Sequence, residues 1–247
     1  MDHVLTVGIS GKAGNSAAGI VLTVKLDLSD RMSAARTSSL YSITTSEWGR
    51  FLDLEISQVS PAYRNWVSVY SKTVAQRNAL LKQVAAAPPA RATELLEPWD
   101  YQLTSVGARV MARRAEVIAE LDELGREAHR KITGTPGNLA VRYLPSVQFE
   151  TPDVQAIAGA FRDRLAQIRR VELIRGVTMC GPHRDDVLFE LDEVNVAAFG
   201  SQGQQRSTVL AVKLAEVEFI RARAGDQPVL LLDDVLSELD ERRRAHL

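Results

Sequence analysis

Residues 200–240 read GSQGQQRSTVLAVKLAEVEFIRARAGDQPVLLLDDVLSELD, and the rest of the chain can be placed around them. A polar turn at Gly200–Gln205 opens a stretch whose apolar residues recur at helical spacing to about Arg223. Gly225–Pro228 makes a turn, and the apolar run Val229–Leu232 follows it without alternation. Such a run is typical of a strand of a parallel sheet that is buried on both faces, so the stretch predicts an α/β protein.

Two acids, Asp233 and Asp234, follow this predicted strand directly, at the end where open parallel sheets bind their ligands. Adjacent carboxylates are costly to desolvate unless a cation meets them. The Mg²⁺ of a nucleoside triphosphate suits them, because it prefers one or two carboxylates together with phosphate oxygens. For VLLLDD alone, an ordinary core strand with a polar loop is an equal alternative. That alternative loses weight once SQGQQ precedes the run and SELD, Ser237–Asp240, follows it.

The order SQGQQ, helix, LLLDD, SELD resembles the signature motif, Walker B strand and D-loop of the ABC-type ATPases of the Rad50/SMC group. Within that group the chain is most similar to the RecF family of bacterial DNA replication and repair proteins. Three further strings resemble RecF segments: FLDLEISQVSPAY at Phe51–Tyr63, QRNALLK at Gln76–Lys82 and GPHRDD at Gly181–Asp186. The resemblance extends from about Gly49 to the last residue.

The resemblance implies an α/β fold, namely an ABC-type ATPase head lobe with an inserted helical hairpin arm. Three segments follow from it: an unmatched N-terminal segment at 1–48, a helical arm domain at 49–131, and a lobe with the signature motif and Walker B strand at 132–247. It also implies ATP and Mg²⁺ as cofactors and a homodimer that forms on ATP binding. In such dimers the signature turn of one head caps the γ-phosphate held by the other.

Carried over by match, Asp233 is the metal ligand, and Asp233 and Asp234 are the catalytic pair, with Asp234 orienting or deprotonating the attacking water. Asp240 shapes the dimer interface. The nucleotide-binding residues are Ser201, Gln202, Gly203, Gln204 and Gln205 of the signature turn, together with Asp240. A helix of roughly 20 residues spans about 30 Å, so we expect Ser201 and Asp233 to belong to different composite sites.

The resemblance implies a cytoplasmic protein, without a membrane association, that binds DNA at junctions of single-stranded gaps and double strands when ATP is bound. It implies RecR and RecO as partners, a role in loading RecA, and a slow ATPase that acts as a switch. The N-terminal string GKAGNSAAG does not match a Walker A loop, because Ala13 follows Lys12 where a Ser or Thr is needed, and Thr6 stands where the first Gly is needed. The alternative is therefore a non-catalytic remnant that acts only as a binding or dimerisation module.

Composition limits the other classes. The net charge is −1 among 247 residues, so any contact with nucleic acid requires a local basic patch. The candidates are Arg109, Arg113 and Arg114 on the arm, where a solvated helix face is the more common meaning of such charges, and the better candidate is the basic face formed by Arg162, Arg164, Arg169 and Arg170. The single Cys180 excludes a disulfide framework and suits a reducing cytosol.

A metal-dependent hydrolase built on Asp185, Asp186, Asp233 and Asp234 is disfavoured, because no His/Asp spacing completes a site.

The periodicity also predicts the other elements. The arm consists of two helices broken at Ala87–Pro89, with the second helix beginning after Pro98. A further helix begins with Thr151 as N-cap and ends at Gly176. The strands are expected at Val4–Ile9, Ile20–Leu26, Leu139–Tyr143, Val177–Met179, Val187–Leu191 and Val194–Phe199. GPHRDD taken alone is interpreted as a loop closed by local ion pairs among His183, Arg184 and the two aspartates.

Overall fold

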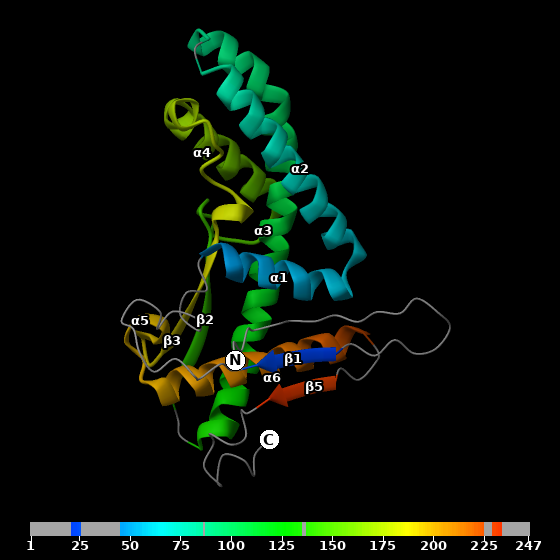
Figure 1. The fold of residues 1–247 in the computed structure, drawn as a ribbon, viewed down its shortest axis with the longest axis vertical. Helices are drawn as coiled ribbons and strands as arrows, with labels where there is room; N and C mark the ends of the chain where they lie inside the picture. Colours follow the sequence, from blue (N-terminus) through cyan, green and yellow to red (C-terminus); the bar gives the residue numbers. More distant parts are fainter. Residues whose placement is uncertain (1–20, 26–44, 86, 135–136, 225–228, 234–247) are drawn as a thin grey trace, which may run out of the picture. The chain divides into compact units, whose positions relative to one another are not determined.

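A computed structural model describes residues 21–25, 45–85, 87–134, 137–224 and 229–233 (Figure 1). The described residues fall into two compact units. Unit 1 comprises those within 1–44, 119–142 and 188–247, and unit 2 those within 45–118 and 143–187. These bounds differ from the three segments predicted from the sequence, whose assignment as domains stays a prediction. No helix of the described residues is long and apolar enough to cross a membrane.

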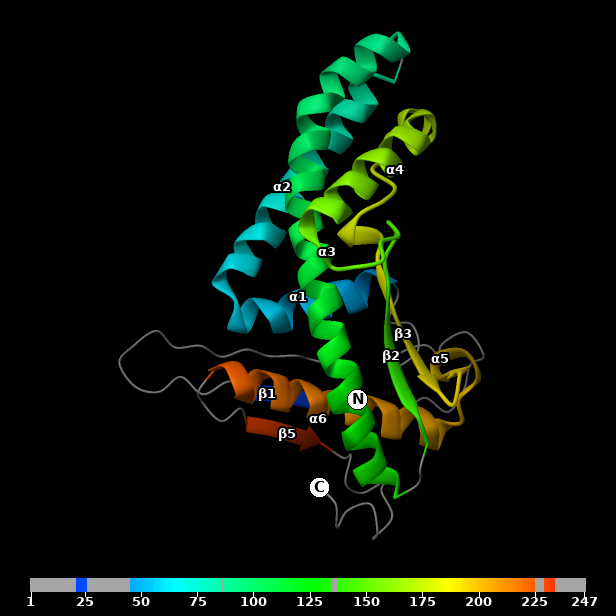
Figure 2. The same cartoon turned by 180° about the vertical axis from the view of Figure 1, so that it is seen from behind.

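Unit 2 is helical and contains the predicted hairpin. Helix α1 spans Thr45–Val59, α2 spans Pro61–Gln83, and α3 begins at Pro89 and ends at Thr133, beyond the unit. Ser60 caps α2, because its side chain accepts a hydrogen bond from the Tyr63 amide at 3.3 Å. Helices α2 and α3 lie side by side in both views (Figures 1 and 2).

The second arm helix begins ten residues earlier than predicted, since Pro98 lies inside α3 rather than before it. Pro89 takes the first position of the helix, where the missing N–H of a proline has no cost. Pro98 removes one backbone hydrogen bond. The helix nevertheless continues through it, because Leu96 and Leu103 on either side are both fully buried.

Helix α4, Val154–Arg175, is capped by Asp153, whose carboxylate accepts from the Ala156 amide at 2.8 Å. The predicted cap Thr151 is therefore wrong by two residues. The predicted end is confirmed, because Gly176 adopts the left-handed conformation with a φ of 66°. After it, residues 176–185 form a loop that contains the short 3-10 helix η1, Pro182–Arg184.

The strand predicted at Val177–Met179 is absent from this described loop. Side chains occupy the backbone groups that a neighbouring strand would use. The amide of Thr178 donates to Asn78 at 2.7 Å, and the amide of Met179 donates to Glu172 at 2.9 Å. Because these side chains already satisfy the amides of Thr178 and Met179, the segment gains little from pairing with a neighbouring strand.

The core of unit 2 lies between α2, α3 and α4. One cluster includes Tyr70, Leu103, Met111, Ile157 and Phe161. A second cluster near the end of the hairpin contains Leu81, Val84, Ala92 and Leu96. The two arm helices therefore pack against each other through both clusters, and α4 covers the first cluster.

A three-stranded sheet has the order β2-β3-β4, with β2 at Leu139–Leu144, β3 at Asp186–Leu191 and β4 at Val194–Asn195. A turn at Asp192 and Glu193, with φ of 51° and 67°, joins the antiparallel pair β3 and β4. The predictions for β2 and β3 are confirmed. The strand predicted to run from Val194 to Phe199 is wrong beyond Asn195, where the Asn195 side chain caps helix α5, Val196–Phe199.

The outer edge of β2 is occupied by side chains from α3. The carboxylate of Asp122 accepts from the Val141 amide at 2.7 Å, and Nε of Arg126 donates to the Leu139 carbonyl at 3.3 Å. Asp122 and Arg126 also pair with each other across one turn of the helix. A backbone donor and a backbone acceptor at the edge of β2 thus form hydrogen bonds within unit 1.

Strands β1, Val21–Lys25, and β5, Val229–Asp233, form a parallel pair in which Lys25 lies opposite Asp233. The strand predicted at Val229–Leu232 and its parallel pairing are confirmed, and the strand predicted at Ile20–Leu26 is present with slightly shorter bounds. Among the described residues this sheet has two strands, so an interior position for β5 stays a prediction. The strand predicted at Val4–Ile9 lies outside the described residues.

Candidate functional site

The signature segment forms the start of α6, Gln202–Ala224, which confirms the long helix predicted to about Arg223. Ser201 Oγ accepts from the Gln204 amide at 3.3 Å, and Gln204 Oε1 accepts from the Ser201 amide at 2.8 Å. This reciprocal pair is a capping box. The turn predicted at Gly200–Gln205 is therefore corrected: it is a cap at Ser201 followed by the first turn of the helix.

The first turn of α6 is open to solvent. Ser201, Gln202, Gly203 and Gln204 are all exposed, and a Cβ added at Gly203 would meet no described atom within 4 Å. The amides of Gln202 and Gly203 occupy helix positions that have no intrahelical acceptor. Together with the positive end of the helix dipole, they favour an anion, and the missing side chain lets it approach the backbone closely.

Gln205 differs from the other four signature residues, because it is half-buried and directed towards α5. Its Nε2 donates to the carbonyl of Val196 at 3.2 Å. The Gly200 amide donates to the same carbonyl at 3.0 Å, and a Cβ at Gly200 would lie only 2.6 Å from it. Gln205 and Gly200 thus fix the turn rather than face a ligand. Phe199, 78% exposed beside this turn, was not predicted as part of the site.

Contacts with α3 hold α6 in place within unit 1. Nε2 of His129 lies 3.3 Å from the Ser207 hydroxyl near the start of α6. At the other end, Arg223 forms two contacts of 2.8 and 2.5 Å with Glu120, and its guanidinium stacks 4.0 Å from the centre of the Phe219 ring. The site at the helix start therefore rests on a helix anchored at both ends.

Between these anchors, α6 buries a carboxyl group that sequence reasoning missed. Glu216 is 1% exposed and accepts from Nζ of Lys213 at 2.8 Å. Burial raises the pKa of Glu216, and Lys213 opposes the shift. The i, i+3 spacing of the two residues is visible in the sequence, but their burial is not.

The Walker B acids are less fully described. Strand β5 ends at Asp233, one residue beyond the predicted Leu232. The side chain of Asp233 and the whole of Asp234 and Asp240 lie outside what the structure describes. Lys12 lies outside it as well. The metal-binding and catalytic roles of Asp233 and Asp234, the interface role of Asp240, and the separation of Ser201 from Asp233 stay predictions.

The GPHRDD loop is closed by residues distant in the sequence, so the prediction of local ion pairs is wrong. Asp185, 2% exposed, accepts from the Ser146 amide at 2.7 Å and its hydroxyl at 2.8 Å, and also from the Tyr143 hydroxyl. His183, two residues earlier, does not pair with Asp185 but contacts Tyr70 and the Thr178 carbonyl. A buried carboxylate is stable only when several donors meet it, and unit 2 supplies them from the 143–146 segment.

His183 bridges the loop and α2. Its Nε2 lies 3.1 Å from the Thr178 carbonyl, which can only accept, so this nitrogen carries the proton. Its Nδ1 lies 2.7 Å from the Tyr70 hydroxyl and accepts from it in the neutral ring. Burial lowers the pKa of His183 below 6.5, with the nearby Arg184 acting in the same direction. The neutral form is therefore favoured.

Arg114 is not available to DNA, contrary to the prediction. Its side chain is 3% exposed; Nε and Nη2 bind Asp53 at 3.2 and 2.9 Å, and Nη1 donates to the Pro182 carbonyl at 2.6 Å. Arg109 is exposed and lies 5.9 Å from the ring centre of Trp66. Arg113 pairs with a glutamate one turn further along α3.

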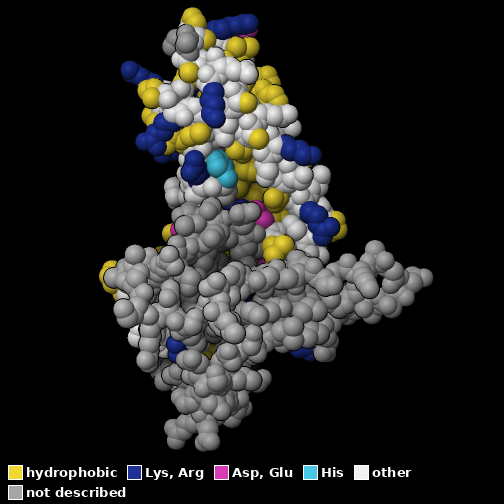
Figure 3. Space-filling model, viewed as in Figure 1, with side chains coloured by type: hydrophobic (Ala, Val, Ile, Leu, Met, Phe, Trp, Pro, Cys, Tyr) yellow, Lys and Arg dark blue, Asp and Glu magenta, His cyan; other side chains and the backbone are white. Residues whose placement is uncertain are grey.

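The basic face of α4 contains two arginines that the structure leaves unengaged. Arg169 pairs with Asp100, and Arg164 donates to Gln167. Arg162 and Arg170 are exposed and form no hydrogen bond or ion pair within the described residues. Lys and Arg side chains are spread over the described helices on the face shown in Figure 3. The described residues contain no group of three or more His, Cys, Asp or Glu side chains that could hold a metal ion.

Comparison with curated proteins shows what this chain resembles. No protein-family model matches it. It is 42% identical to the "DNA replication and repair protein RecF" of Bacillus subtilis over 199 residues, which cover 80% of this chain and 54% of that protein. It is 44% identical to the protein of the same description from Geobacillus thermodenitrificans over 199 residues, covering 80% and 53%.

Solved structures agree. The recombination mediator protein RecF with ATP, in the RecFOR pathway, superimposes with a TM-score of 0.78 at 30% identity, covering 91% of this chain and 58% of that one. The corresponding RecF–ATPrS structure gives a TM-score of 0.74 at 32% identity, covering 81% and 53%. The chain spans about half the length of the curated relatives it matches. Over that half, it is similar in sequence and in structure to the RecF DNA replication and repair proteins, and it has the ABC-type ATPase fold that the sequence predicted.

Proposed function

We propose that this chain supplies the signature half of a composite ATP site to a second RecF-type head, as part of an ATP-dependent DNA repair function. The observation that carries the proposal is the open first turn of α6. Ser201 and Gln204 form its cap, and Gly203 adds no side chain over the amides. An anion from outside the chain fits this turn, and the solved relatives were determined with ATP or ATPrS.

The residues of the first turn of α6 suit the γ-phosphate end of a nucleoside triphosphate. The amides of Gln202 and Gly203 would donate to oxygens of a γ-phosphate, and the Ser201 hydroxyl would lie beside them while it caps the helix. ATP, when bound to the second head, would supply the negatively charged γ-phosphate that this turn contacts. Under the same proposal Asp233 holds Mg²⁺, Asp234 orients water and Asp240 contributes to the dimer interface, which rests on the family resemblance.

The chain itself then acts as a binding partner and not as a complete ATPase. Its N-terminal string lacks the Walker A pattern, so Lys12 has neither the spaced Gly nor the following hydroxyl that a triphosphate requires. The runner-up function, a dimerisation module that needs no nucleotide, uses the same surface. The two differ in whether association depends on ATP.

A mixing experiment tests the proposal. This chain is combined with the intact Bacillus subtilis relative, with and without Mg-ATP, and association is measured by sedimentation velocity. We expect ATP-dependent association that Gly203→Glu abolishes, because the Cβ of the added side chain lies in open space and its carboxylate repels the triphosphate. The matched control is Gly159→Glu, another helical glycine with open space around its Cβ, which leaves association unchanged.

Two results would contradict the proposal. Association of equal strength without ATP would favour the dimerisation module. Association that Gly203→Glu and Gly159→Glu reduce equally would show that the first turn of α6 is not the contact. In addition, calorimetry of the chain alone should show no tight Mg-ATP binding. Micromolar binding that disappears in Lys12→Ala would mean that the N-terminal Gly-rich string is a phosphate site after all.

We also propose that the chain contacts DNA, at junctions of single and double strands, through the exposed face of α4, and that RecR, RecO and RecA are its functional partners. Support comes from Arg162 and Arg170, whose charges are not met within the described residues. Phosphate contacts release counterions, so removing them lowers the salt dependence of binding. Arg162→Gln/Arg170→Gln should weaken binding to gapped DNA with a shallower salt slope, whereas Arg91→Gln, an arginine paired with Glu94, should not.

A further inference from the structure

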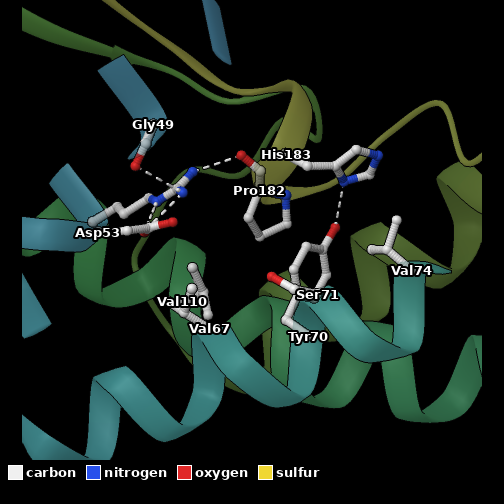
Figure 4. Close-up of a pocket in the computed structure, with 10 residues that line it drawn as sticks. Gly49, Asp53, Val67, Tyr70, Ser71, Val74, Val110, Pro182 and His183 are labelled. Carbon is white, nitrogen blue, oxygen red and sulfur yellow. Dashed lines mark hydrogen bonds and ion pairs between the residues drawn. The ribbon is translucent and has the colours of Figure 1, made fainter. Parts of the chain in front are cut away.

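Unit 2 contains a cavity of about 290 Å³ that neither the nucleotide nor the DNA proposal uses (Figure 4). Helices α1, α2 and α3 and the 3-10 helix η1 contribute its lining. Most of its walls are apolar, and they include Val67, Val74, Val110 and the ring of Tyr70. Figure 3 shows apolar side chains around a hollow below a histidine on this face.

One polar group in the cavity has unused acceptor capacity. Oδ1 of Asp53 accepts from the Tyr63 hydroxyl at 2.6 Å and from Arg114 at 2.9 Å. Its Oδ2 accepts no hydrogen bond within the described residues, and the side chain is 21% exposed. Arg114 neutralises the carboxylate, so the free oxygen requires a hydrogen-bond donor rather than a full positive charge.

The other polar residues of the cavity do not add a charge. Both nitrogens of His183 are used, one by Tyr70 and one by Thr178, so the imidazole contributes an uncharged ring. Ser71 is exposed at the rim and forms no hydrogen bond within the described residues. The cavity thus suits an apolar group that carries one hydrogen-bond donor.

The volume limits the size of that group. Cavities of about 150 Å³ accommodate benzene, whereas pockets for whole small-molecule ligands begin near 300 Å³. About 290 Å³ suits one large aromatic side chain. The exposed Ser71 and half-exposed Val67 and Val74 mark an opening along α2. An aromatic side chain can enter through this opening while its own backbone stays outside the cavity.

We propose that this cavity receives a tryptophan side chain of a partner protein, with the indole N–H donating to Oδ2 of Asp53. Indole is a donor without an acceptor, which suits a carboxylate oxygen, and its two rings fill the volume better than one. Aromatic anchors in such pockets dominate many protein–protein interfaces. All the lining residues belong to unit 2 and none to the signature turn, so the inference stands apart from the proposed ATP site.

Small probes test the chemistry on the full chain. N-acetyl-tryptophanamide should bind saturably, as measured by chemical-shift changes in NMR titrations. Its 1-methylindole analogue, which lacks the donor, should bind about tenfold more weakly. N-acetyl-leucinamide should bind more weakly still. Equal affinity of the methylated and unmethylated probes would overturn the contact with Asp53, and tighter binding of N-acetyl-argininamide would show that the cavity selects a cation.

Two matched variants test the location. Ser71→Phe places a ring over the opening, whereas Ser68→Phe adds the same ring to an exposed position of α2 that does not line the cavity. We expect Ser71→Phe to lose probe binding at least tenfold and Ser68→Phe to retain it. Val67→Phe, at another edge of the opening, should repeat the loss if Ser71→Phe fails to fold. Equal binding by Ser71→Phe and Ser68→Phe would overturn the proposal.

Discussion

The guanidinium of Arg77 lies 2.6 Å from the carboxylate of Glu172, and both side chains are completely buried. Arg77 also contacts Asp100 and the Thr178 hydroxyl, each at 2.8 Å. One side chain therefore joins α2 to α3, α4 and the loop after α4. Its five N–H groups make it suited to several acceptors at once.

Removing this cation should destabilise unit 2 strongly. In Arg77→Met, the carboxylate of Glu172 stays buried without its partner, which typically costs about 3–5 kcal/mol. Urea denaturation followed by circular dichroism measures the loss. Arg91→Met is the control, because Arg91 and Glu94 form an exposed pair and its removal should leave the midpoint nearly unchanged. Similar midpoints for the two variants would contradict a structural role for the buried pair.

His183 should make stability depend on pH. Its folded-state pKa lies below the ordinary value of 6.5, so the unfolded chain binds the proton more tightly. The contribution is fully present above pH 6.5 and is lost as the pH falls towards the folded-state pKa, by at most about 1.4 kcal/mol per pH unit. Protonation also removes the acceptor that Tyr70 uses.

The comparison of wild type with His183→Gln isolates this group from other titrating residues. Denaturation curves at pH 7.5 and 5.5 should differ more for the wild type than for the variant. If the two proteins lose the same stability between these pH values, His183 is already protonated or makes no net contribution.

Gly181 should tolerate no side chain. Its φ is 113°, and a Cβ there would lie 2.3 Å from the Tyr70 hydroxyl and 2.4 Å from the Phe161 ring. Gly181→Ala therefore combines backbone strain with overpacking, and we expect a loss of about 3 kcal/mol or more in chemical denaturation. Gly159→Ala, in open space within α4, should instead gain roughly 0.5–1 kcal/mol. A Gly181→Ala variant as stable as wild type would refute the packing argument.

Ser201 allows capping to be separated from ligand binding. Asp caps helices about as well as Ser, so Ser201→Asp should retain stability, whereas Ser201→Ala should lose about 1 kcal/mol. The same Asp places a negative charge beside the proposed phosphate position. Sedimentation with the Bacillus subtilis relative and ATP should therefore show association lost in Ser201→Asp but only weakened in Ser201→Ala. Full association by Ser201→Asp would exclude Ser201 from the phosphate contact.

The parts of the fold that could be predicted are those whose sequence pattern is local. The hairpin, α6 and β5 have long periodic or continuous apolar segments, and each is present. The strand expected at 177–179 failed because its backbone partners come from Asn78, 100 positions away. The strand expected beyond Asn195 failed because one capping side chain turns the chain into a helix.

The candidate site shows the same division. The signature string predicted that Ser201–Gln205 lie together, and the S-x-x-Q spacing contains the capping box. Arg114 was wrongly placed among surface cations, since its partners Asp53 and Pro182 lie over 60 residues away on either side. A basic residue on a helical pattern gives no sign of which long-range acceptors will bury it.

The side chains that cover β2 have a consequence for how this protein behaves at high concentration. An edge strand with free amides and carbonyls is a template for addition of a strand from another molecule, and hence for aggregation. Asp122 accepts from the Val141 amide, and Arg126 donates to the Leu139 carbonyl. These two backbone groups are therefore not free to pair with a strand of another molecule. In a concentrated sample, the resistance of the protein to aggregation through this edge then depends on Asp122 and Arg126 of α3.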